Sequence, residues 1–178
     1  MSSLTPMDFG VDTLDAIQLL HKRGRYPQFL VLLYSAIDTL GWLAAIDEWA
    51  TGASFKDWVN RYMLPYDDLT CTAEDLWGAR NALLHTATAE SKVSRQGQAR
   101  QIWYCGKGRS RELLDQKIGA RKDVVPVRTV VLLRAFAEGT ARFTDAINND
   151  GLLADRVKKK SEHWLHWVPP SEFDGPAA

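Results

Sequence analysis

The sequence predicts a mainly α-helical domain with a small β-hairpin. Apolar residues recur at helical spacing in several segments, and between residues 26 and 49 they surround nearly the whole helix, which is typical of a central buried helix. Thr72 followed by Asp75 resembles a capping box and predicts that another helix begins there. Strand-like sequence is confined to residues 101–104 and 123–125, which we expect to pair as the hairpin.

The other expected helices are placed by their start and stop signals. A short amphipathic helix is expected over residues 11–22, before Gly24. Its inner face holds Val11, Leu14, Ile17, Leu20 and His21. Ser54 can cap a short helix that Pro65 ends, and a weak helix is expected over residues 111–118.

The last third of the chain should be dominated by one long helix. Pro126 suits its first turn, and the helix is expected to run through Ile147 and to stop at residues 148–151. A final short helix should precede Pro169.

Length and composition fit one globular domain. The chain has 178 residues, 46% hydrophobic and 25% charged, and we assign residues 1–168 to the domain and residues 169–178 to a frayed tail. The 22 basic and 22 acidic side chains cancel, so any attraction to nucleic acid must be local. Without a secretory signal or a membrane span, the sequence predicts a cytoplasmic protein with no membrane partner. Cys71 and Cys105 lack CxxC spacing and are expected to be reduced thiols.

The helix predicted from Ala73 to about His85 carries an unusual polar stripe. Because each helical residue advances by about 100°, Glu74, Gly78, Asn81 and His85 share one face. Gly78 would cost about 1 kcal/mol relative to alanine if that face met water. A second helix packed against Gly78 would account for the glycine and would place Asn81 and His85 at the contact.

Arg80 and His85 point in different directions on the same expected helix. They lie five residues apart, or about 140° around an ideal helix, so one straight helix is not expected to unite them. Fraying near His85, or pairing of two copies of this helix across a two-fold axis, would bring them together. We therefore expect a homodimer.

These side chains suit the cleavage of RNA by its own 2′-hydroxyl without a metal or another cofactor. The His85 imidazole can move a proton to or from an oxygen near neutral pH. The Arg80 guanidinium can donate two hydrogen bonds to a phosphate whose negative charge grows in the transition state. Asn81 can hold the phosphate or the imidazole. Asp38, one turn beyond Tyr34 in the buried helix, needs a partner and is a further candidate for the site.

Two segments resemble the HEPN family (higher eukaryotes and prokaryotes nucleotide-binding). They are Tyr34-Ser35-Ala36-Ile37-Asp38-Thr39-Leu40-Gly41 and Asp75-Leu76-Trp77-Gly78-Ala79-Arg80-Asn81-Ala82-Leu83-Leu84-His85. The ribonucleases of that family share an Arg-polar-x-x-x-His signature, and the following residues 86–91 also resemble bacterial members. The resemblance covers about residues 26 to 95.

The resemblance implies an antiparallel helical bundle that dimerises around the motif helix. It also implies an RNase that is frequently a toxin or a phage-defence effector, with an antitoxin protein as a partner. It maps Arg80 and His85 to the catalytic pair and Asn81 to the polar position. Ala87 departs from the tyrosine that many active toxins carry two residues after the histidine.

Two other hypotheses are compatible with the same residues, one structural and one of a non-catalytic binding module. Arg80 could form a salt bridge to Asp38 or Glu74, with His85 interacting favourably with the helix dipole. The domain could also be a non-catalytic dimeric HEPN module that binds RNA, a nucleotide or a protein.

Residues 92–128 hold ten basic side chains against three acidic ones. Within this segment the candidate RNA-binding residues are Lys107, Arg109, Arg111, Trp103 and Tyr104, the two aromatic rings being positions on which bases could stack. The alternative is a solvated basic loop that balances the acidic residues between Asp38 and Asp75.

His163 and His166 stand at i, i+3 spacing, but no cysteine or carboxylate pair completes a metal-binding set in the sequence. We expect no metal site, and we expect Trp164 and Trp167 to anchor the C-terminal segment on the bundle.

Overall fold

The computed structural model describes residues 6–86, 88, 90–106 and 111–162, and this part of the chain is mainly helical, as the sequence predicts. In chain order the elements are α1 (Pro6–Lys22), α2 (Tyr26–Ala44), α3 (Gly52–Trp58), the π-helix η1 (Val59–Met63), α4 (Ala73–Thr86), α5 (Lys92–Arg95), β1 (Gln101–Cys105), α6 (Arg111–Ile118), β2 (Val124–Arg128), α7 (Thr129–Asn149) and α8 (Gly151–Ser161). The predicted tail and the segment from His163 to Trp167 lie outside the described residues.

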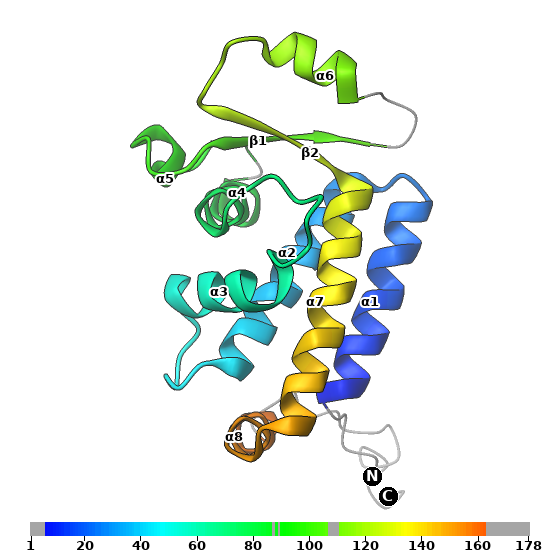
Figure 1. Ribbon diagram of the computed structural model, residues 1–178, viewed down its shortest axis with the longest axis vertical. Helices are drawn as coiled ribbons and strands as arrows, with labels where there is room; N and C mark the ends of the chain where they lie inside the picture. Colours follow the sequence, from blue (N-terminus) through cyan, green and yellow to red (C-terminus); the bar gives the residue numbers. More distant parts are fainter. Residues whose placement is uncertain (1–5, 87, 89, 107–110, 163–178) are drawn as a thin grey trace, which may run out of the picture.

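Helix α2 is the central helix, and it contacts α1, α3, α4 and α8 (Figure 1). The predicted burial is confirmed, because side chains on several of its faces are fully enclosed, namely Phe29, Leu33, Tyr34, Ile37 and Leu43. The helix is shorter than predicted and ends at Ala44, so Ile46 and Trp49 are 85% and 75% exposed.

The end of α2 is fixed by a side chain from α8. The Lys160 ammonium donates hydrogen bonds to the carbonyl oxygens of Trp42, Ala45 and Asp47 at 2.6, 2.8 and 2.7 Å. These bonds supply a donor to the carbonyls of Ala45 and Asp47 just beyond the helix and a second donor to that of Trp42, which also accepts from the Ala45 amide. Such a contact between residues more than a hundred positions apart leaves no local signal, and the apolar pattern alone therefore overestimates the length of the helix.

Helices α1 and α7 run side by side along one flank of the molecule (Figure 1), and α7 also packs against η1. The fully buried Trp58 fills the space beneath α7, with ring centroids 6.2 Å from both Phe136 and Phe143. On the other side, α3 lies across α2 so closely that a Cβ on Gly41 would come within 2.9 Å of the Ser54 carbonyl oxygen. Thr51, rather than Ser54, caps α3, and Ser54 completes the capping box.

The two predicted strands do pair, but the hairpin is wrong: β1 and β2 are parallel, with Gln101 opposite Val124 and Cys105 opposite Arg128. Parallel strands require a crossover connection, and here α6 provides it. Pro126 lies within β2 instead of opening the long helix, which begins at Thr129. Figure 1 shows α6 on the side of the sheet away from the helical bundle.

The described helices include none that is both long enough and apolar enough to span a membrane.

Candidate functional site

Helix α4 begins with the predicted capping box. The Thr72 hydroxyl accepts a hydrogen bond from the Asp75 backbone amide at 3.2 Å, and the Asp75 carboxylate accepts one from the Thr72 amide at 2.9 Å. Leu76 and Ala82 are buried on the inner side of the helix. The cap and these contacts fix the rotation of α4 and hence the direction in which Arg80, Asn81 and His85 project.

Arg80 is the centre of a network that joins α2 to the end of α4. Its Nε and Nη2 atoms lie 2.7 and 2.6 Å from the same Asp38 carboxylate oxygen. Its Nη1 donates to the Asn81 side-chain oxygen at 3.0 Å and lies 3.2 Å from His85 Nε2. All four candidate catalytic residues are therefore brought together.

The expectation that one helix cannot unite Arg80 and His85 is wrong. Helix α4 continues to Thr86, yet the two side chains meet within one chain. The angle between their Cα–Cβ directions ignores the reach of the long, flexible arginine side chain. Neither fraying nor a second subunit is needed for the contact, and the geometric argument for a dimer no longer holds.

The contact with Arg80 also indicates which nitrogen of His85 carries its proton. A guanidinium has no hydrogen-bond acceptor, so in the Arg80–His85 hydrogen bond His85 Nε2 must accept. That arrangement corresponds to a neutral imidazole with its proton on Nδ1. His85 is exposed in the last turn of the helix, with its Nε2 lone pair directed at the arginine.

The Asp38 carboxylate pairs with Arg80 in a mostly buried position that disfavours its negative charge. Both side chains of the pair are only 19% exposed. Burial raises the pKa of the Asp38 carboxyl above its ordinary value, while the hydrogen bond and positive charge of Arg80 act in the opposite direction. The position is therefore unfavourable for a carboxylate, and Arg80 compensates for it only in part.

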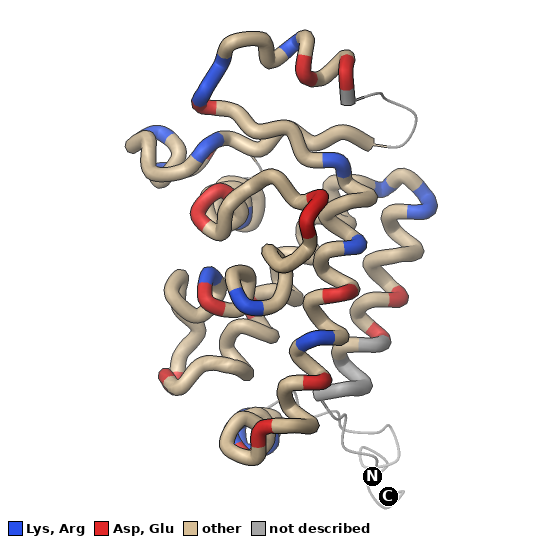
Figure 2. Tube along the Cα trace, in the orientation of Figure 1, with Lys and Arg blue, Asp and Glu red and all other residues tan. Residues whose placement is uncertain are grey.

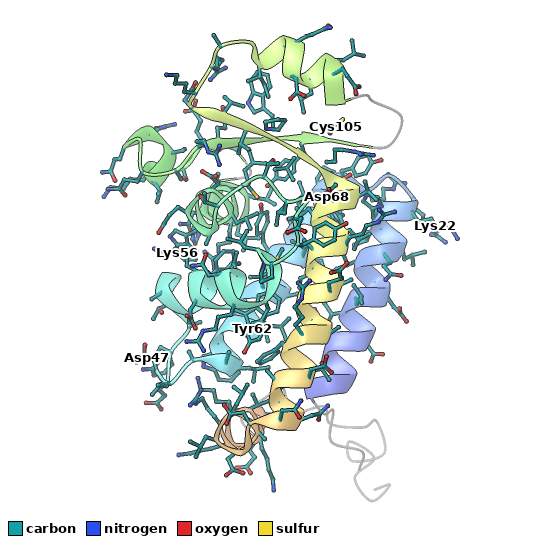
Figure 3. All side chains as sticks on the ribbon, viewed as in Figure 1. Lys22, Asp47, Lys56, Tyr62, Asp68 and Cys105 are labelled. Atoms are coloured by element: carbon teal, nitrogen blue, oxygen red, sulfur yellow. The ribbon has the colours of Figure 1, made fainter. Side chains whose placement is uncertain are left out.

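Trp77 is a member of this cluster that the sequence argument missed. The guanidinium carbon of Arg80 lies 5.1 Å from the centre of the Trp77 ring, within range of a cation–π interaction. The spacing of three residues along α4 was the available signal, since such side chains share a helix face. Glu74, the other carboxylate considered for Arg80, instead pairs with Lys56 at 2.8 Å. Lys56 belongs to α3 and is labelled in Figure 3.

Gly78 allows a close approach, as expected, but the partner is not a second helix or subunit. A Cβ at Gly78 would lie 3.0 Å from the Ala99 side chain and 3.6 Å from the Ser91 hydroxyl. The segment between α5 and β1 of the same chain covers this face. Gly78 is therefore not available as the centre of a dimer contact.

The candidate RNA-binding residues do not form one described surface. Lys107 and Arg109 lie outside the described residues, as does the side chain of Arg111, whose backbone begins α6. Trp103 and Tyr104 are neighbours in β1 and so project to opposite faces of the sheet. The Trp103 ring lies 5.2 Å from the Arg121 guanidinium carbon, whereas the Tyr104 hydroxyl is hydrogen-bonded to that of Tyr34 in the core.

The Tyr104 contact belongs to the interior of the protein. Burial raises the pKa values of Tyr34 and Tyr104, and it raises the pKa of the neighbouring Cys71 thiol to about 12. These groups stay protonated at neutral pH. We assign Tyr104 to the core and keep only Trp103 as a candidate for an outward contact.

An open groove of about 650 Å³ starts at Asn81 and His85 and continues along α5. In the sequence, Lys92 and Arg95 belong to a basic segment, and no local pattern places them beside the motif. Among the described residues, no group of three histidine, cysteine or acidic side chains is arranged to hold a metal ion.

Comparisons with protein-family models, curated proteins and solved structures found no match for this chain.

Proposed function

We propose that this protein is a HEPN-like endoribonuclease that cuts RNA by attack of the 2′-hydroxyl, without a metal. The observation that carries the proposal is the convergence of Arg80, Asn81 and His85 at the open end of α4, with Arg80 held from behind by Asp38. Arginine, amide and imidazole groups are the types that phosphate binding and proton transfer require.

The reaction can be written with these groups. An RNA phosphate accepts hydrogen bonds from Arg80 Nη1 and the Asn81 amide, displacing the contact between Arg80 and His85. His85 Nε2 then takes the proton of the 2′-hydroxyl, the 2′-oxygen bonds to phosphorus, and the bond from phosphorus to the 5′-oxygen breaks. The leaving oxygen takes a proton from water or from a second imidazole. The products are a 2′,3′-cyclic phosphate and a 5′-hydroxyl.

A homodimer remains part of the proposal, now for a chemical reason. One His85 can serve only one of the two proton transfers at a time, and the His85 of a second copy could protonate the leaving oxygen. The proposal also includes a toxin or defence role with an antitoxin partner. Light scattering at micromolar concentration tests the dimer, and a strict monomer would remove it from the mechanism.

The proposal is tested with purified protein and labelled single-stranded RNA in EDTA. We expect cleavage by the wild type, and a loss on the order of 10²–10⁴ in rate for His85→Ala, the usual contribution of general acid–base catalysis. Arg80→Ala should lose a comparable amount, and Arg80→Lys should recover little because an ammonium lacks the planar fork. Asn81→Ala should lose less.

Arg61→Ala is the matched control, because Arg61 forms an exposed pair with Asp57 on another part of the surface. It should cut as the wild type does. The enzyme hypothesis is contradicted if the wild type leaves varied RNAs intact both in EDTA and in Mg²⁺. It is also contradicted if His85→Ala cuts RNA as fast as the wild type does. The alternative is then a non-catalytic module that binds RNA. That alternative is compatible with the structure, because the hydrogen bonds of Arg80 are satisfied within the chain.

A further inference from the structure

The groove beside His85 is the most developed surface feature near the motif. It is lined by Asn81 and His85 of α4, by Thr88, Glu90 and Ser91, and by four residues of α5 and its end, namely Lys92, Val93, Arg95 and Gln96. Its volume of about 650 Å³ lies within the roughly 300–1,000 Å³ of sites that take a small organic molecule. The groove is therefore large enough for a nucleotide.

The wall formed by α5 is held firmly in place. Ser91 and Ser94 form a reciprocal capping box, with N–H to Oγ distances of 2.9 and 3.2 Å. The absence of a side chain at Gly78 lets Ala99 and Ser91 pack directly on α4. These contacts keep α5 against α4, so the groove exists before a ligand arrives.

The charges around the groove favour a polyanion. Lys92 is exposed, and within the described part of the chain its ammonium forms no ion pair. Arg95 reaches Glu90 at 3.3 Å, but the two side chains are 72% and 55% exposed, so this contact is weak. Two cations thus face one carboxylate, and Figure 2 shows basic positions on α5.

The groove also offers groups that suit a base. Val93 provides an apolar contact, and the Gln96 amide provides both a donor and an acceptor. A nucleotide carries an apolar ring face, polar ring edges and a charged phosphate, and it therefore matches this combination.

We propose that this groove binds the nucleotide next to the reacting phosphate, and that the Lys92 ammonium contacts the following phosphate of the same RNA strand. The inference rests on the proposed function, because the groove and the candidate site share Asn81 and His85. Lys92 binds as a point charge and reads no sequence. Glu90 weakens the same interaction by repulsion.

Binding is measured by fluorescence anisotropy in the His85→Ala background, with a labelled single-stranded RNA of about eight nucleotides, a length within the range that single-strand-binding grooves cover. Lys92→Glu should weaken binding about tenfold and reduce the slope of log affinity against log salt by about 0.7, the value for one phosphate contact on a single strand. Glu90→Gln should tighten binding.

Lys158→Glu is the control, because Lys158 is an exposed lysine on α8, which lies at the opposite end of the molecule from the sheet (Figure 1). It changes the net charge by the same amount and should leave the affinity unchanged. Equal effects of Lys92→Glu and Lys158→Glu, or an unaltered salt slope in Lys92→Glu, would overturn the groove assignment.

Failure of the groove and failure of the proposed function give different results. If the wild type cleaves RNA but Lys92→Glu and Lys158→Glu bind RNA equally well, the ribonuclease proposal is supported and the groove is not the RNA-binding site. If the wild type fails to cleave while Lys92→Glu selectively weakens binding, the groove stands as an RNA-binding site and the catalytic proposal fails.

Discussion

At the scale of single residues, Arg80 connects the interior of the protein to the candidate reaction site. One edge of its guanidinium bonds to Asp38, and the remaining Nη1 faces Asn81 and His85. The buried edge orients the exposed one. In the proposed mechanism Asp38 is thus a positioning residue, and its effect on the reaction should pass through Arg80.

Asp38→Asn tests this positioning. The amide keeps the size of the side chain but holds the guanidinium less firmly, and misplacement of a reacting group can cost up to about 100-fold in rate. We expect kcat for RNA cleavage to fall by about 10- to 100-fold while KM changes less. The free energy of unfolding should fall by about 1–3 kcal/mol, because Arg80 loses its charged partner while relief of carboxylate burial offsets part of that loss.

The control for Asp38→Asn is Asp57→Asn, which removes an exposed carboxylate from a surface pair with Arg61. It should alter neither kcat nor stability appreciably. If Asp38→Asn loses stability in proportion to activity, or keeps full activity, Asp38 has only a structural role.

Sequence patterns predict which residues belong to the candidate site, but they do not predict how the side chains of these residues pair. Arg80, Asn81 and His85 were found from the motif, and Asp38 was found because a carboxylate in an apolar helix needs a partner. The pairing of Arg80 with Asp38 rather than Glu74 depends on how α2 and α4 cross. That crossing is a tertiary feature, and it leaves no mark in the spacing of either helix.

At the scale of elements, Asp75 joins the start of α4 to the sheet. Its carboxylate is almost fully buried and accepts hydrogen bonds from the Thr72 amide at 2.9 Å, the Arg100 amide at 2.7 Å and the Arg100 Nη2 at 2.6 Å. Burial opposes its ionisation, but the hydrogen bonds from Arg100 and from the two backbone amides lower the pKa overall.

This lowered pKa predicts a pH dependence of stability. The unfolded chain binds a proton at Asp75 near its ordinary pKa of about 3.9, whereas the folded chain does so only at lower pH. The stabilisation is therefore complete above about pH 4 to 5 and is lost as pH falls through the folded pKa. Asp38 has the opposite sign, since its raised pKa makes its charged form unfavourable to folding.

Asp75→Asn should lower the free energy of unfolding by about 2–3 kcal/mol at neutral pH, the usual range for hydrogen bonds to a buried charged group. It should also flatten the loss of stability on acidification, measured by urea unfolding at several pH values. Asp57→Asn, in an exposed pair with Arg61, is the control and should leave the acid dependence unchanged. An acid dependence unaltered by Asp75→Asn would contradict the assignment.

The sheet shows how far local sequence patterns predict the pairing of strands. The strand propensity of both runs and the helix between them were visible in the sequence, and together they form a strand–helix–strand pattern that favours parallel pairing. A hairpin was expected because the two runs were considered without the intervening helix. Pro126 was similarly ambiguous, since proline is accepted both in the first turn of a helix and at the edge of a sheet.

At the scale of the whole molecule, the helical bundle was predictable because its apolar periodicity is long and regular. Contacts between distant segments were not predictable from the sequence. They are the hydrogen bonds of Lys160 at the end of α2, the packing of Ala99 against Gly78, and the groove between α4 and α5. The groove is lined by side chains from the end of α4 and from the segment around α5, which have no shared periodicity. Folding creates this site by bringing ordinary surface residues beside the motif.

The measurement that tests the proposed ribonuclease activity most directly uses an RNA strand and the same strand with 2′-deoxy sugars at every cleavage position. In EDTA, the wild type should cut the first into fragments ending in 2′,3′-cyclic phosphate and 5′-hydroxyl groups. It should leave the second intact, because the attacking oxygen is absent, and His85→Ala should cut neither appreciably. Cleavage of the 2′-deoxy strand, or products ending in a 3′-hydroxyl and a 5′-phosphate, would contradict 2′-hydroxyl attack at Arg80 and His85.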